Sequence, residues 1–160
     1  MKAIHSMIAA LGLAFVPPAA ANAAVGDPET IIYRFPGVHD DGGVVNNGVA
    51  TVFHCTNFSG VTETLRFATR DNSGILVSNS TRDVGHLKTA TAVTHANLAY
   101  SADVVLFAGP VLVDSGTTAI AATSINVICT AMTIDAANAK PTFAVSLRGI
   151  RFNPAPGSQE

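Results

Sequence analysis

The stretch VTETLRFATRDNSGILVS, residues 61–78, decides the fold class. In its first half Leu65 and Phe67 alternate with polar or small residues, the period-two pattern of a strand with one buried face. The sequence DNSG at 71–74 follows, and Asn and Gly tolerate the positive φ angles that tight turns need. The segment 75–78 then returns as a partner strand. Residues 61–78 are therefore predicted to form a β-hairpin.

Short strands of the same kind are expected along the rest of the chain, separated by Gly, Pro, Asn and Asp residues. The expected segments are 30–35, 49–57, 88–94, 104–107, 111–113, 117–123, 125–135, 143–147 and 150–152, with 95–102 left open as a loop or a helical turn. Such spacing is typical of a sandwich or barrel. We expect an all-β fold, a single antiparallel β-sandwich over residues 24–152, with an extended tail at 153–160.

The first 23 residues match a secretory signal peptide, with a helical apolar part. Lys2 supplies the positive start, residues 8–16 are uniformly apolar, and small residues lead up to Ala23. Cleavage is predicted between Ala23 and Ala24. The apolar run is too short for a transmembrane anchor, which needs roughly 20 residues, and no Cys follows it to carry a lipid.

The charges and apolar segments of the expected mature chain, residues 24–160, argue against two classes of partner. Eight Lys and Arg stand against eleven Asp and Glu, a net charge of −3, and they are scattered. Nucleic acid is not expected because no basic stripe is present. No basic amphipathic segment or second long apolar run indicates a membrane surface or anchor after cleavage. The predicted location is secreted or periplasmic.

Two cysteines, Cys55 and Cys129, are each expected in the middle of a strand. In an oxidising compartment such a pair favours a disulfide over two buried free thiols. The bridge would join either two facing sheets or two neighbouring strands. This resembles the inter-sheet disulfide of immunoglobulin-like sandwiches, although the chain has no Trp to pack against it.

Three further stretches carry a resemblance: FHCTN at 53–57, ATSINVICTAM at 122–132 and RFNP at 151–154. Together they resemble a group of small secreted bacterial proteins to which no activity is assigned. The resemblance covers most of the mature chain and implies a bacterial source. It implies nothing about mechanism.

One motif resembles a catalytic signature. The sequence VLVDSGTTAI at 111–120 is similar to the active-site motif of aspartic proteases, in which an Asp on a tight Gly turn shares a proton with a second Asp. A chain with one such motif would have to form a homodimer that contributes Asp114 twice. Only 42 residues follow Thr118, too few for the remaining parts of that fold. The plainer interpretation is a hairpin turn at 114–116.

A Gly-rich loop at 37–48 is the candidate binding loop, with His39, Asp40 and Asp41 as its candidate site residues. Rigid sheets commonly present functional loops. His54, His86 and His95 lack the spacing of metal ligands, so no metal and no cofactor are expected.

These observations predict a non-catalytic binding or interaction module for an unknown protein or small ligand. The alternative is a surface-assembly subunit that pairs through its tails or sheet edges. An aspartic-type hydrolase through Asp114 is a third hypothesis. The oligomeric state stays open.

Overall fold

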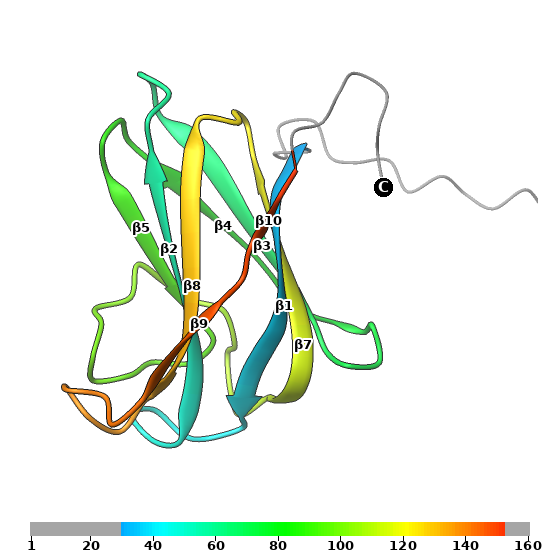
Figure 1. The fold of residues 1–160 in the computed structure, drawn as a ribbon, viewed down its shortest axis with the longest axis vertical. Helices are drawn as coiled ribbons and strands as arrows, with labels where there is room; N and C mark the ends of the chain where they lie inside the picture. The colour runs from blue at the N-terminus through cyan, green and yellow to red at the C-terminus, as the bar shows by residue number, and fades with distance from the viewer. Residues whose placement is uncertain (1–29, 153–160) are drawn as a thin grey trace, which may run out of the picture.

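The computed structural model describes residues 30–152, which form two five-stranded sheets packed face to face (Figure 1). The first sheet has the order β10-β1-β7-β3-β4 and the second β6-β5-β2-β8-β9; every pair is antiparallel except β5 with β6. The strands are β1 (Thr30–Asp41), β2 (Val49–Asn57), β3 (Glu63–Arg70), β4 (Leu76–Val84), β5 (Thr89–Val93), β6 (Val104–Val105), β7 (Leu112–Ala122), β8 (Val127–Asp135), β9 (Ala144–Leu147) and β10 (Ile150–Arg151). The predicted all-β sandwich is confirmed. The expected signal peptide, its cleavage site at Ala23–Ala24 and the tail at 153–160 lie outside the described residues.

The predicted hairpin at 61–78 is present as β3 and β4. Leu65 and Phe67 are fully buried, as their alternation required. The Asp71 carboxylate closes the turn by accepting the backbone N–H groups of Ser73 and Ile75, at 2.8 and 2.9 Å. Gly74 takes a φ of 80°, which explains a glycine at that point of the turn.

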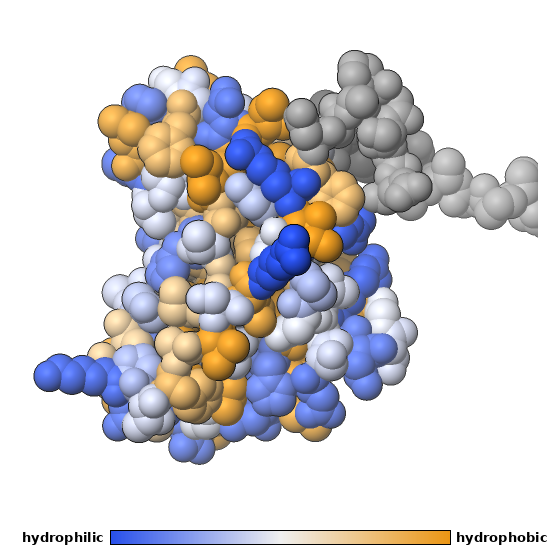
Figure 2. Space-filling view, in the orientation of Figure 1, coloured by the Kyte–Doolittle hydropathy of each residue, from blue (hydrophilic) through white to orange (hydrophobic). Residues whose placement is uncertain are grey.

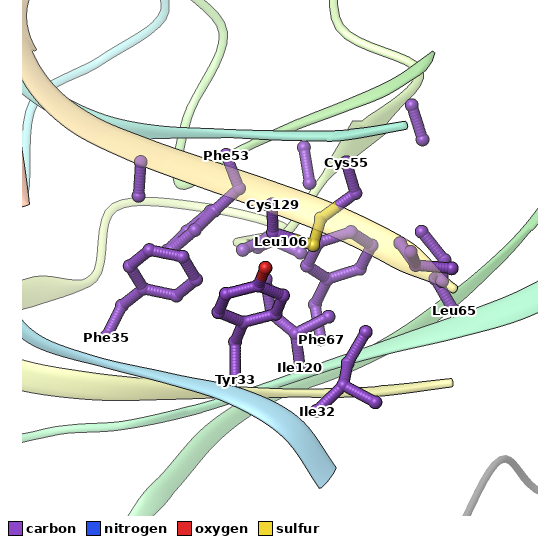
Figure 3. Packing of buried hydrophobic residues seen from close by; sticks show 14 of the residues in the cluster. Ile32, Tyr33, Phe35, Phe53, Cys55, Leu65, Phe67, Leu106, Ile120 and Cys129 are labelled. Carbon is purple, nitrogen blue, oxygen red and sulfur yellow. A yellow bond between two sulfur atoms is a disulfide. The ribbon is translucent and has the colours of Figure 1, made fainter. Parts of the chain in front are cut away.

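Aromatic rings join the two sheets at the centre of the core (Figure 3). Phe53 on β2 meets Phe35 on β1 edge to face, with ring centroids 5.7 Å apart, and Phe67 on β3 at 6.2 Å. All three side chains are fully buried. Burial of an aromatic side chain contributes roughly 1.5–3 kcal/mol, so this cluster holds the sheets together.

The disulfide between Cys55 and Cys129 lies within one sheet. The two residues are direct partners on β2 and β8, with Cα atoms 4.1 Å apart, and both are buried in the core. Of the two arrangements left open by the sequence, the bridge between neighbouring strands is the one observed. It therefore differs from the inter-sheet bridge of immunoglobulin-like domains.

Two stretches that were expected to form a loop and a turn are parts of continuous strands, and each contains a glycine. Residues 37–41 belong to β1, and Asp114 to Gly116 belong to β7, where Gly116 pairs with Val38. The pairing of β1 with β7 shifts register on both sides of Val38, which marks bulges. Gly37 has a φ of 80°, and a Cβ on Gly116 would lie 2.5 Å from the Arg70 carbonyl oxygen. Glycine is needed at both positions, but for bulges and close packing rather than for turns.

The chain crosses from one sheet to the other between β9 and β10. β9 pairs with β8 in the second sheet, whereas β10 pairs with β1 in the first. A Cβ on Gly149 would lie 2.5 Å from the Phe35 ring, so a side chain there would press on the aromatic core.

The segment at 94–103 is irregular and covers part of the outer face of the second sheet. Val52, Val93 and Ile134 are buried beneath Tyr100 and its neighbours. The expected strand at 125–135 begins two residues later, at Val127, and its outward Ile128 is exposed because the cover does not extend that far.

We expect the double substitution Cys55→Ala and Cys129→Ala to lower the free energy of unfolding by roughly 4 kcal/mol, because the bridge closes a long loop in the unfolded chain. Urea unfolding of the oxidised, reduced and substituted proteins measures it. The reduced wild type is the control and should match the variant. Equal stability of all three forms would contradict a stabilising role for the bridge.

Candidate functional site

A buried ion pair lies at the lower end of the sandwich in Figure 1, between Asp40 near the end of β1 and His95 after β5. The His95 Nδ1 atom is 2.7 Å from the Asp40 carboxylate, and the two residues are 5% and 1% exposed. Asp40 points inward because β1 alternates, so its charge needs a partner in the protein. His95 is that partner.

Both ring nitrogens of His95 face hydrogen-bond acceptors. Nδ1 meets the Asp40 carboxylate, and Nε2 lies 2.9 Å from the backbone carbonyl oxygen of Asn47. A carboxylate and a carbonyl can only accept, so the ring must carry protons on both nitrogens to satisfy both bonds. The hydrogen bond with Asp40 accordingly raises the pKa of His95 above its ordinary value, against the opposing effect of burial. The geometry favours imidazolium.

The loop at 42–48 is fastened at several points. The backbone carbonyl of Asn47 accepts a hydrogen bond from His95 Nε2–H. The Asn46 N–H donates to the Ala96 carbonyl at 2.8 Å. At its start, the Gly42 and Gly43 N–H groups donate to the Asp40 and Asp41 carboxylates. These bonds hold the loop against the segment that follows β5.

A cleft of about 440 Å³ opens between this loop and the segment that follows β6. One wall is the stretch from Gly43 to Val45, and the other runs from Val105 to Pro110 through Phe107, with His95 and Ala96 between them. Most of the lining is apolar. Val44 and Val45 are largely exposed to solvent although their side chains are apolar. The volume lies in the range of small-molecule sites, about 300–1,000 Å³.

None of the three predicted site residues lines the cleft, but Asp40 and Asp41 each bond a residue of its wall, His95 and Gly43 respectively. The His39 Nδ1–H donates outward to the Asp114 carbonyl at 2.9 Å, and Asp41 holds Gly43. The candidate loop is thus shorter than predicted, 42–48 instead of 37–48, and Asp40 and Asp41 at the end of β1 fasten its first residues. Sequence reasoning did not find the pairing with His95, since 55 residues separate the partners and no local pattern links them.

Asp114 is exposed on the continuous strand β7. The tight Gly turn that aspartic-type chemistry requires is not formed there. His54 and His86 lie apart from Asp114. His54 packs edge to face on Tyr100, and His86 Nδ1 accepts the Gly60 N–H. Within residues 30–152, no group of three His, Cys, Asp or Glu side chains is arranged to hold a metal ion.

The Asp40–His95 pair is arranged to hold structure rather than to transfer protons. A general base needs a free nitrogen lone pair within reach of the proton it removes. Both nitrogens of His95 are already engaged with acceptors. The His95 ring is therefore a fixed part of the cleft wall.

No family model matches this chain, and no curated protein matches its sequence. Among solved structures, the crystal structure of Thermotoga maritima 1070 is similar at 11% identity, with a TM-score of 0.46, over 74% of this chain and 93% of that one. At this score the likeness carries no information on function. No helix in the described part of the chain is long and apolar enough to cross a membrane.

The substitution His95→Gln should destabilise the protein most at low pH, by roughly 3 kcal/mol, since it leaves the buried Asp40 without its charged partner. The pKa of His95 is higher in the folded state than in the unfolded state. The pair therefore stabilises fully below about pH 6.5 and loses this contribution as the pH rises through the folded-state pKa. Urea unfolding of both proteins between pH 6 and pH 9 measures the difference.

His54 is present in both proteins, so its contribution to the pH dependence of stability cancels in the difference. Burial lowers the pKa of His54, and its own contribution to stability therefore rises with pH instead of falling. A stability difference that does not change with pH would contradict the charged pair.

Proposed function

We propose that this protein is an exported, non-catalytic binding domain that captures a small apolar ligand in the cleft between residues 43–45 and 105–110. The observation that carries the proposal is the cleft itself. Its two exposed valines, Val44 and Val45, face a second apolar wall across a space of small-molecule size.

The chemistry of the cleft favours an uncharged ligand. His95 is the charged group in its lining, and both of its ring nitrogens are engaged within the protein. A ligand would therefore gain affinity from burial of apolar surface, which contributes roughly 25 cal/mol per Å². The fastened loop supports binding because a wall that is already ordered loses little entropy when a ligand arrives.

Export is supported by two separate observations. The first 23 residues carry the pattern of a cleavable signal. The disulfide between Cys55 and Cys129 is stable in oxidising compartments.

The alternative of an assembly subunit that pairs through sheet edges has less support. Three of the four outermost strands, β6, β9 and β10, have only two to four residues. Short edges are a common means of preventing pairing with another chain.

A neutral fluorescent probe, N-phenyl-1-naphthylamine, tests the cleft. We expect saturable fluorescence enhancement with the wild type and about tenfold weaker binding with Val45→Asp, because one apolar contact is lost and a charge is introduced. Fluorescence titration measures both.

Val145→Asp is the matched control. Val145 is 59% exposed and Val45 is 65% exposed, but Val145 lies on β9 outside the cleft. The control should bind the probe as the wild type does. Equal weakening by both substitutions, or no saturation with the wild type, would overturn the proposal.

A further inference from the structure

The backbone carbonyl of Asn47 connects the buried ion pair with the wall of the cleft. Its oxygen atom lies 2.9 Å from His95 Nε2. The same oxygen packs closely against Gly43, because a Cβ added to Gly43 would lie 2.7 Å from it. Gly43 and His95 both line the cleft. A movement of this one carbonyl would therefore change the shape of the cleft wall.

The loop around Asn47 has an uncommon backbone shape. It lies at the lower end of the molecule, where Figure 2 shows hydrophilic and hydrophobic residues side by side. Asn46 has a φ of 61° and Gly48 a φ of 69°, both in the left-handed region. Such conformations persist where surrounding contacts fix them. Two neighbouring bonds do so here, from the Asn46 N–H to the Ala96 carbonyl and from His95 to the Asn47 carbonyl. The second of them depends on a proton.

Removal of one proton from His95 breaks the contact with Asn47 and keeps the contact with Asp40. A neutral imidazole has a single N–H. The negative charge of the Asp40 carboxylate retains that N–H on Nδ1, which is 2.7 Å away. The lone pair of Nε2 then faces the lone pairs of the Asn47 carbonyl oxygen. The contact changes from a hydrogen bond into a repulsion, and the loop is released at this point.

Two carboxylates act on the proton of His95, and both come from the end of β1. Asp40 bonds the ring directly and has the larger effect in raising the pKa of His95. The carboxylate of Asp41, which accepts the Gly43 N–H, adds a smaller attraction. The other residues that line the cleft carry no charge.

The titratable groups on the flanking elements do not face the buried imidazole. His39 points to the other side of β1, since strand residues alternate, and its Nδ1 bonds a backbone carbonyl of β7. Asp135, at the end of β8, is held by hydrogen bonds from Asn138 and Thr142, which lower its pKa to about 2 and keep it ionised near neutral pH. Lys140, in the loop that follows, is exposed.

A ligand in the cleft benefits from the fastened form of the loop. A wall that has been released must be ordered again when the ligand arrives, and this loss of entropy weakens binding. The ligand removes little water from the imidazolium itself, because His95 is already only 5% exposed. The protonated form therefore binds an apolar ligand more tightly than the neutral form.

We propose that protonation of His95 regulates ligand capture, so that the cleft holds its ligand when the ring carries both protons and releases it when the ring loses one. This inference rests on the proposed function, because it concerns the same cleft. It adds a direction, with tight binding at acidic pH and release as the pH rises above neutral. Linkage requires the reverse effect as well, so a bound ligand makes His95 hold its proton more strongly.

Titration of the wild type with N-phenyl-1-naphthylamine at pH 6 and pH 9 tests the inference, since the probe is uncharged at both. We expect about tenfold tighter binding at pH 6, because one hydrogen bond from a charged group is lost at pH 9. Circular dichroism at both values checks that the fold is retained. Saturable binding of equal strength, or tighter binding at pH 9, would overturn the inference and leave the proposed function in place. Absence of saturable binding at both would overturn the two together.

His39→Gln is the matched control for His95→Gln, because His39 is the neighbour of Asp40 in the chain but its side chain faces away from the pair. The control should keep the tenfold difference between pH 6 and pH 9. His95→Gln should bind with the same affinity at both. Persistence of the difference in His95→Gln, or its loss in His39→Gln, would refute the role of His95.

An NMR titration of the His95 ring in the wild type gives a second readout that requires no variant. A tenfold coupling predicts that saturating probe raises the midpoint of the His95 titration by about one pH unit. The midpoint of His39 should stay where it is. An unchanged midpoint for His95 in the presence of bound probe would contradict the inference, even if His95→Gln does not fold.

Discussion

The contact of Phe53 with Phe35 and Phe67 is the interaction on which the rest of the structure depends. It joins β2 of one sheet to β1 and β3 of the other, and all three rings are fully buried. Because these strands are fixed against one another, the loops they carry gather at two opposite ends. One end has the cleft between the 42–48 loop and the segment that follows β6. The cleft would not exist if the sheets could slide.

The sequence predicted the parts of the fold that depend on local alternation. Leu65 and Phe67 identified the first hairpin because period-two burial is written directly in the residues. Gly37 and Gly116 were misleading, since glycine serves bulges and close packing as well as turns. The candidate site was harder to predict from the sequence than the strands were. Asp40 was predicted as a site residue because it lay in the expected Gly-rich loop. Its contact with His95 depends on how β1 and β5 pack in the folded domain, which no local sequence pattern records.

The two ends use polar residues in a common way. At one end the buried Asp40 carboxylate organises a loop through His95, and at the other the buried Asn57 amide donates to the carbonyls of Val61 and Val84 and so joins the β2–β3 loop to the end of β4. Each buried polar group satisfies its hydrogen bonds with backbone atoms or charged partners, as burial demands. The exposed apolar residues beside them are thereby held in place without being part of the core.

The pairing of the first described strand with the last has a consequence for how the domain is completed. The outer edge of β1 receives β10, after the chain has crossed between the sheets at Gly149. Pairing of strands so far apart in the chain is slow, because closing the long intervening loop costs entropy. A chain translocated from its N-terminus would stay unfinished until its last strand had emerged. Under the export proposed above, the domain would close only after this last strand had left the translocation channel.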